Sequence, residues 1–242
     1  GKSFVYLNLS RYVRLISGGK VTAPVLFHNN ATNQPGLLSH FDLVVFDEAQ
    51  TLSFENPGEI IGVLKDYLES GRFSRGGKQQ TAATAGIAIL ANIPLDAGGH
   101  PRFSNLFLNL PEFLRETAFI DRIHGILPGW KLPRIQEEAI SKNIGFKADF
   151  FGEVLHNLRH RVGYEEYIKA YGQIVGTQDI RDRNAIIRLA AGYLKLLFSD
   201  LKLSHNELVE YCLRPAASLR QTVRDQLAGL DPEYKRLIIG VA

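Results

Sequence analysis

The chain has 242 residues, of which 45% are hydrophobic and 22% charged, and its formal net charge is +3. These proportions are typical of a soluble globular protein and exclude an intrinsically disordered chain. No apolar run approaches the roughly 18 to 20 residues that span a bilayer, and no secretory signal opens the sequence, so we expect no membrane partner. The small positive charge does not by itself indicate a nucleic-acid partner.

Cys212 is the single cysteine, which excludes an intramolecular disulfide and a cysteine-rich zinc site. It lies among apolar residues with helical spacing, so we predict a buried thiol in a helix. An unpaired thiol favours a reducing compartment, and we expect a cytoplasmic protein.

The chain opens on Gly1-Lys2-Ser3, followed by an apolar run that begins at Phe4. This order matches the end of the P-loop pattern GxxxxGK[ST], which runs into a helix. In such a loop (Walker A) the lysine contacts the β- and γ-phosphates of ATP, and the hydroxyl ligates Mg²⁺. The glycines that precede Gly1 in the full pattern are absent from the sequence, so we expect an incomplete phosphate cradle. A cloning remnant is the alternative interpretation of these three residues.

Two continuous apolar runs of strand length, 43–46 and 86–91, are typical of parallel strands covered on both faces. Between them, residues 60–70 have the apolar period of an amphipathic helix. Alternating strands and helices predict a three-layer αβα domain with a parallel sheet.

Polar side chains follow each of these two runs. Asp47 and Glu48 end the first, where side chains of a parallel strand face the ligand crevice. Asp47 is predicted to hold Mg²⁺ as in a Walker B motif, and Glu48 to polarise the attacking water. Asn92 ends the second run and is predicted to orient that water. The alternatives are a solvated acidic turn for the carboxylates and a simple turn former for the amide.

Two arginines further along the chain are candidates for transition-state stabilisation. Arg122 is predicted to reach the nucleotide of a neighbouring subunit as an arginine finger, with Arg115 as a rival. The alternative for Arg122 is a surface pair with Asp121. Arg181 opens a predicted helix from which it can reach the phosphates, with Arg183 as its rival.

The second part of the chain reads as helices. We predict them over 146–161, 164–174, 179–198 and 204–214, and then an amphipathic stretch to about residue 230. Ser204 and Glu207 have the spacing of a capping box. The sequence therefore predicts two domains, an αβα nucleotide-binding domain over 1–131, truncated within Walker A, and a smaller all-α lid with a helical tail over 132–242. His156 and His160 lack an HExxH pattern, so we predict a solvated helix face there rather than a zinc site.

Lys2, the Asp47-Glu48 pair, Asn92, Arg122 and Arg181 follow the order of Walker A, Walker B, sensor 1, arginine finger and sensor 2 in AAA+ ATPases. The order is stronger evidence than any one of these signals, and it predicts ATP and Mg²⁺ as cofactors.

Several runs make the resemblance more specific. Ile16 to Lys20, Val45 to Glu48, Lys65 to Gly71, Phe119 to His124 with Leu127 to Trp130, and Gly192 to Leu197 resemble the Lon-like AAA+ ATPases of bacterial BREX phage-defence systems. The resemblance covers about residues 1 to 225. It implies a homo-oligomeric ring that acts on DNA, with a core similar to the MCM helicases. No Ser-Lys protease dyad can be assigned, so we expect no peptidase activity from this sequence.

The resemblance also gives a role to the basic segment 71–84, where Arg72, Arg75 and Lys78 surround a Gly76-Gly77 hairpin signal. In the helicase-like relatives a hairpin at this place points into the ring's channel, where positive side chains follow a phosphate backbone. A solvated basic loop is the alternative.

Two other functions stay open. One is a DNA-binding ring whose assembly is controlled by nucleotide, with negligible turnover. The other is the unfoldase motor of a Lon-type ATP-dependent protease.

Overall fold

The computed structural model describes residues 2–74, 80–133, 136–137 and 141–242. The chain forms two compact units. Unit 1 comprises Gly1–Glu116 and Trp130–His160, and unit 2 comprises Thr117–Gly129 and Arg161–Ala242. Each unit is therefore built from two separate stretches of the chain, whereas the sequence predicted a single domain boundary after residue 131. The assignment of nucleotide binding to residues 1–131 and of a lid to residues 132–242 stays a prediction.

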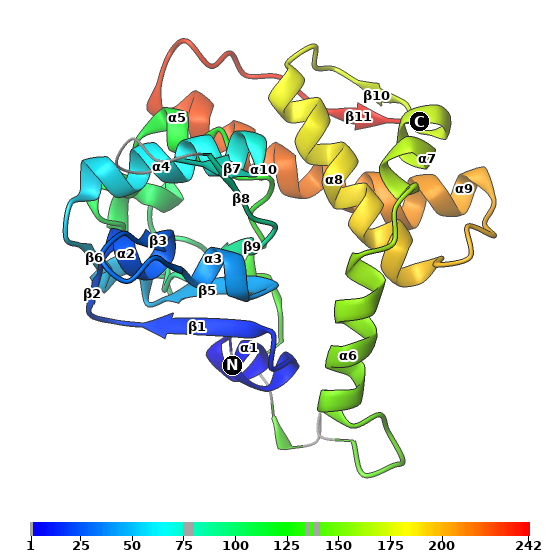
Figure 1. Ribbon diagram of the computed structural model, residues 1–242. Coiled ribbons are helices and arrows are strands. Elements are labelled where there is room, and N and C mark those ends of the chain that lie inside the picture. Colours follow the sequence, from blue (N-terminus) through cyan, green and yellow to red (C-terminus); the bar gives the residue numbers. More distant parts are fainter. Residues whose placement is uncertain (1, 75–79, 134–135, 138–140) are drawn as a thin grey trace. The chain divides into compact units, whose positions relative to one another are not determined.

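Unit 1 is built on a parallel sheet of three strands, which lie side by side in Figure 1 in the order β1-β5-β9. The strands are β1 (Val13–Ser17), β5 (Leu43–Asp47) and β9 (Gly86–Ile89). Residues 44–47 of the central strand are buried. This confirms that the apolar run 43–46 is a covered parallel strand. The run 86–91 is a strand only as far as Ile89.

A long helix, α4 (Pro57–Ser70), confirms the amphipathic pattern between the two strands. It begins with Pro57, which is favourable in a first helical turn because an N–H there would have no helical partner. Gly71, with φ 71°, caps its C-terminal end. Its buried face contains Ile60, Ile61, Leu64 and Tyr67. The N-terminal helix α1 (Lys2–Leu9) buries no residue fully, and its Phe4 and Leu7 are exposed.

Short elements complete unit 1. The helical ones are α2 (Ala23–Leu26), α3 (Leu37–His40), η1 (Ala49–Thr51), η2 (Leu106–Asn109), η3 (Glu112–Leu114) and η4 (Gly129–Lys131, which begins at the last residue of unit 2's segment). The paired strands are β2 (Lys20–Val21) with β6 (Ser53–Phe54), β3 (His28–Asn29) with β4 (Gln34–Pro35), and β7 (Arg72–Phe73) with β8 (Thr81–Ala82).

Helix α6 (Ala148–Arg159) is attached to the start of β5 through Asp42. Nδ1 of His156 lies 2.6 Å from Asp42 Oδ2, and Arg159 Nη1 lies 3.0 Å from Oδ1. The His156 ring stacks on Tyr12 at 3.8 Å between centroids. The predicted solvated histidine face is therefore wrong for His156, because a carboxylate and an aromatic ring, both distant in the sequence, cover it.

Unit 2 is mainly helical, as predicted for the second part of the chain. Its helices are α5 (Thr117–Ile120), α7 (Tyr164–Tyr171), α8 (Ile180–Leu197), α9 (His205–Glu207), the π-helical turn Leu208–Leu213 and α10 (Arg214–Leu230). The capping box is confirmed, because Ser204 Oγ accepts from the N–H of Glu207 and the carboxylate of Glu207 accepts from the N–H of Ser204. Cys212 is fully buried in the π-helical turn, as predicted.

Two details of unit 2 differ from the prediction. The helix predicted over 164–174 ends at Tyr171, because Gly172 leaves the helical region and its N–H caps the carbonyl of Ile168. The next residues form β10 (Ile174–Val175), which pairs antiparallel with β11 (Gly240–Val241). Unit 2 therefore contains a small sheet and is not purely α-helical. The sequence did not predict this sheet, because its two strands are far apart in the chain and too short to show a periodic pattern. No described helix is long and apolar enough to cross a membrane.

A buried ion network holds α5, α8 and α10 of unit 2 together. Arg220 is fully buried; its Nε lies 2.7 Å from Asp182 Oδ1, and its Nη2 lies 2.9 Å from Asp121 Oδ1. Its Nη1 donates to the carbonyls of Asp121 and Ile123 at 2.9 and 2.7 Å. Thr177 Oγ1 donates to the other oxygen of Asp182 at 2.9 Å. The guanidinium thus bridges two buried carboxylates and also satisfies the backbone that follows α5, while Arg181 and Arg224 place further positive charge beside Asp121 and Asp182.

Replacing Arg220 with methionine should destabilise unit 2 by about 3 to 5 kcal/mol, because two buried carboxylates lose their common cation. Arg214→Met on the same helix is the matched control. Arg214 pairs with Glu210 but is 63% exposed, so its loss should cost less than about 1 kcal/mol. Amide hydrogen exchange of α8 and α10 measures both changes. Equal protection in the two variants would contradict a structural role for the network.

Candidate functional site

Asp47 and Glu48 lie where the central strand of the sheet ends. The side chain of Asp47 is buried, with 7% exposure, and its Oδ1 accepts a hydrogen bond from the N–H of Glu48 at 2.9 Å. Glu48 is exposed and begins the turn η1. The strand therefore fixes one carboxylate inside the fold and directs the next into solvent.

The backbone of Glu48 is in the left-handed region, with φ 52° and ψ 47°. This region is unfavourable for residues that carry a Cβ atom, and such strain is concentrated at functional sites. The Glu48 carbonyl accepts from Thr51 twice, from the N–H at 2.8 Å and from Oγ1 at 2.9 Å. These two bonds hold the conformation in place.

Lys2 and Asn92 meet although 90 residues separate them in the sequence. The ammonium of Lys2 donates to Oδ1 of Asn92 at 2.8 Å, and both residues are exposed. Asn92 follows β9, and β9 pairs directly with β5, which carries Asp47. The structure thus brings Lys2 and Asn92 into contact at the sheet edge where the Asp47-Glu48 pair also lies. Ser3 is the half-buried second residue of α1, and Gly1 lies outside the described residues.

Gln50 is a site residue that the sequence analysis missed. Its side-chain Oε1 accepts from the N–H of Asn92 at 3.3 Å. Its place two residues after Glu48 was the available signal, since a residue in a tight turn after a strand can reach the end of the neighbouring strand.

Arg122 and Arg181 belong to unit 2. Arg122 is half-buried and its Nη1 donates to the carbonyl of Ala118 at 2.7 Å. Arg181 lies 2.9 Å from Asp121, and its side chain is 41% exposed while that of Asp121 is 1% exposed. A surface pair of Asp121 with Arg122, the alternative weighed above, is therefore wrong, because Asp121 is buried between Arg181 and Arg220.

The two rival arginines also have backbone partners. Arg115 Nε donates to the carbonyl of Leu110 at 2.7 Å, and Arg183 Nη1 donates to that of Ile174 at 3.2 Å. These contacts therefore do not decide whether Arg115 or Arg122 is the better candidate for the arginine finger, or whether Arg181 or Arg183 is the better candidate for sensor 2.

His124 is a half-buried base two residues after Arg122. Burial, and after it the positive charges of Arg188 and Arg220, together lower its pKa to about 4. The ring is therefore neutral at pH 7 and can accept from Arg188, whose Nη1 lies 3.3 Å from Nε2. The segment after α5 thus adds no histidine charge to unit 2 at neutral pH.

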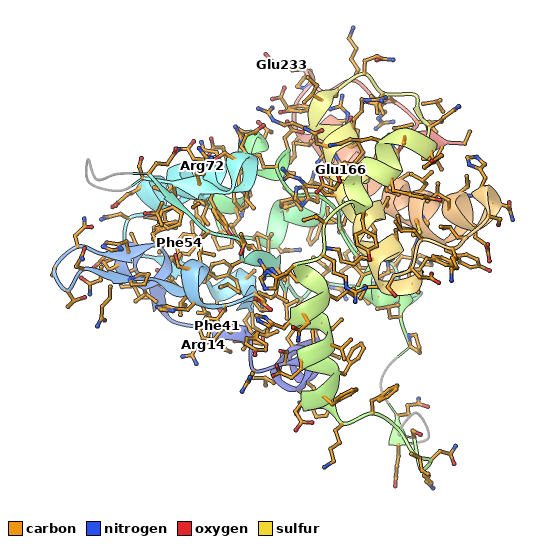
Figure 2. The ribbon with its side chains drawn as sticks, turned by 45° about the vertical axis from the view of Figure 1, so that its right-hand side comes forward. Arg14, Phe41, Phe54, Arg72, Glu166 and Glu233 are labelled. Atoms are coloured by element: carbon orange, nitrogen blue, oxygen red, sulfur yellow. The ribbon has the colours of Figure 1, made fainter. Side chains whose placement is uncertain are left out.

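The predicted hairpin exists at its base, where β7 pairs antiparallel with β8. Arg72, labelled in Figure 2, is exposed in β7, while its neighbour Phe73 is 1% exposed and packs against Phe27 and Tyr67. A buried aromatic residue thus anchors the base of the hairpin. Arg75, Lys78 and the Gly76-Gly77 turn lie outside the described residues.

Asp47 carries a carboxylate and Ser3 a hydroxyl, oxygen groups of the kind that ligate Mg²⁺. Within the described ranges no three His, Cys, Asp or Glu side chains are grouped so that they could hold a metal ion. A magnesium ion bound through one or two protein oxygens and substrate phosphates does not need such a group.

Comparison with known proteins places the whole chain in one family. The family described as "Lon-like protease BrxL-like, ATPase domain" matches residues 1–239. The chain is 33% identical over 95% of its length to the Lon-like protease BrxL of Escherichia coli O9:H4 (strain HS). It is also 33% identical, over 94% of its length, to the protein of that name from Bacillus cereus (strain H3081.97). It spans 33% of the length of each of these curated relatives.

The left-handed backbone at Glu48 predicts a reversal of the usual order of alanine and glycine. Glu48→Gly should be more stable than Glu48→Ala by about 1 kcal/mol, because only the glycine avoids the Cβ clash of this conformation. At Glu69, an exposed position of α4, the order should be the opposite by about 1 kcal/mol, since glycine is a poor helix former. Urea unfolding of the four variants measures both differences. The same order at both positions would argue against strain at Glu48.

Proposed function

The chain belongs to the BrxL-like ATPase-domain family, and from this premise we propose that it binds and hydrolyses ATP as the AAA+ module of a homo-oligomeric ring that acts on DNA in phage defence. The observation that carries the proposal is the contact between Lys2 and Asn92 at the edge of the sheet that bears Asp47 and Glu48. A P-loop lysine has to reach this edge, because it is where nucleotide binds in open α/β sheets.

ATP and Mg²⁺ fit the residues present. Gly1, Lys2 and Ser3 form the end of Walker A, with Lys2 as the cation for the β- and γ-phosphates. The hydroxyl of Ser3 and the carboxylate of Asp47 would hold Mg²⁺, which when bound neutralises phosphate charge. Because Asp47 is buried and already receives the N–H of Glu48, its second oxygen has a defined direction.

Glu48 and Asn92 are the residues that act on water in this proposal. The exposed carboxylate of Glu48 takes the proton of the attacking water as a general base. Asn92 orients that water through its side-chain amide. The contact of Lys2 with Asn92 supports this role, because it places the amide beside the group that binds the γ-phosphate.

Arg122 and Arg181 have proposed roles toward the phosphates from unit 2. Arg122 acts on the nucleotide of a neighbouring subunit, and Arg181 acts as the sensor 2 residue. The guanidinium of Arg181 is partly exposed, which supports such a role. Its ion pair with Asp121 holds the side chain in a defined position.

DNA is the proposed substrate of the ring, bound by Arg72, Arg75 and Lys78 of the hairpin. The antiparallel β7–β8 pair and the exposed Arg72 support a projecting basic element. A DNA-binding ring with negligible turnover is the alternative. An unfoldase motor of a protease is a second alternative, which the name of the two relatives, Lon-like protease, favours.

Glu48→Gln in a full-length protein that carries this chain should reduce steady-state ATP hydrolysis by at least about 100-fold, because general-base catalysis contributes roughly 10²- to 10⁴-fold. Lys2→Ala should abolish ATP binding in calorimetry, whereas Glu48→Gln should retain it. Lys20→Ala, an exposed lysine paired with Glu55, is the control for loss of charge. Equal rates for the wild type and Glu48→Gln would refute the motor and leave the ring with negligible turnover.

The proposed role of Arg122 in trans predicts complementation. Arg122→Ala and Glu48→Gln subunits should each be inactive alone, and co-assembly should restore part of the activity. In mixed rings some interfaces pair an intact Glu48 with an intact neighbouring Arg122. Absence of recovery in rings whose mixed composition is verified by native mass spectrometry would exclude a finger in trans. The same experiment with Arg115→Ala tests the rival.

Replacing both Arg75 and Lys78 with alanine should weaken DNA binding at every sequence. It should also reduce the slope of log K against log salt by up to about 1.8 on duplex DNA, since each phosphate contact contributes about 0.9. Basal ATP hydrolysis should persist. Arg14→Ala with Lys142→Ala removes the same charge from exposed positions of unit 1 and should leave the slope unchanged. An unchanged slope in the hairpin variant would mean that the segment is a solvated loop.

A further inference from the structure

Three hydrogen bonds continue the pairing of β5 with β9 beyond the strands themselves. Leu90 N donates to the carbonyl of Phe46 at 2.8 Å, and Ala49 N donates to the carbonyl of Leu90 at 2.9 Å. The N–H of Asn92 then donates to Oε1 of Gln50 at 3.3 Å. The turn after Asp47 is thus joined to the chain after β9 as far as Asn92.

The third bond uses a side chain because the backbone of the turn is already engaged. The carbonyls of Glu48 and Ala49 accept from Thr51 and Leu52 as the chain enters η1. A ladder of main-chain bonds cannot continue past that point. The half-buried side chain of Gln50 supplies the acceptor instead.

Asn92 is consequently held from two sides. Gln50 binds its main-chain N–H, and Lys2 binds its side-chain Oδ1 at 2.8 Å. The bond to Gln50 does not involve a group that would contact phosphate. It therefore persists when Lys2 turns from Asn92 toward a nucleotide, whereas the bond to Lys2 does not.

We infer that Gln50 is a positioning residue for hydrolysis, one that holds Asn92 in place relative to the Asp47-Glu48 turn when Lys2 engages ATP. The inference rests on the proposed function. A displacement of about 1 Å at a catalytic group can cost roughly 100-fold in rate, so one hydrogen bond at this place has a measurable effect. Because Gln50 acts through Asn92, its loss should lower kcat and leave the binding of ATP to Lys2 and Ser3 unchanged.

Gln50→Leu in the full-length protein should lower kcat about tenfold, with KM for ATP within about twofold of the wild type. Gln50→Glu should retain most of kcat, because its carboxylate can still accept from the Asn92 N–H. Gln34→Leu, the same change at an exposed position of β4, is the matched control and should have no effect. Gln50→Ala replaces Gln50→Leu if the leucine variant does not fold, as judged by its thermal unfolding.

A double-mutant cycle with Asn92→Ala separates action through Asn92 from an independent effect. In the Asn92→Ala background, Gln50→Leu should reduce kcat by less than about twofold further. A full second tenfold loss there, or an unchanged kcat for Gln50→Leu in the wild-type background, would overturn the inference.

If Glu48→Gln hydrolyses ATP as fast as the wild type, the proposed function fails and this role fails with it. If Glu48→Gln is slow and Gln50→Leu is not, only the role of Gln50 is overturned.

Discussion

Backbone hydrogen bonds between β5 and β9 run in parallel register from Leu43 opposite Gly86 to Phe46 opposite Ile89. The positions of Asp47, Glu48 and Asn92 depend on this register. A shift by one residue would turn every side chain of the shifted strand to the opposite face of the sheet. Asp47 would then no longer be the buried carboxylate at the strand end, and Asn92 would lose its hydrogen bond to Gln50. The bonds of Ala49 and Gln50 extend the same constraint into the two loops.

Unit 2 has a different organising interaction, the buried guanidinium of Arg220. It connects Asp121 at the end of α5 with Asp182 in the first turn of α8. Arg181 shares Asp121 with it, and Arg122 is the next residue in the chain. The network therefore fixes the backbone from which both proposed phosphate-contacting arginines project. Buried ionic networks are demanding because each charge needs its partner. This gives the segment 117–129 its firm attachment to α8 and α10 rather than to the residues that precede it.

The turn at Glu48 combines strain with exposure. A left-handed glutamate is retained only where surrounding contacts fix it, and here Thr51 donates twice to its carbonyl. Ala49 and Gln50 join the same turn to Leu90 and Asn92. As a consequence, the carboxylate of Glu48 is held in a fixed, exposed position, while its neighbour Asp47 is buried. Two adjacent acidic residues thereby acquire different environments, which is consistent with the different roles proposed for them, one toward Mg²⁺ and one toward water.

The sequence by itself determined the strand at 43–46, the presence but not the end of the strand that begins at Gly86, the helix ending at Ser70, the capping box at Ser204 and the helical character of the second part. Each depends on local periodicity or on contacts three or four residues apart. It also indicated the family, since the order of the motifs is a property of the chain. Only the tertiary structure decided that Lys2 meets Asn92, that Gln50 accepts from the Asn92 N–H, that His156 binds Asp42 and that Asp121 is buried with Arg220. These contacts join residues tens of positions apart, and whether a charged or polar side chain is solvated or buried depends on the partner that the fold brings to it.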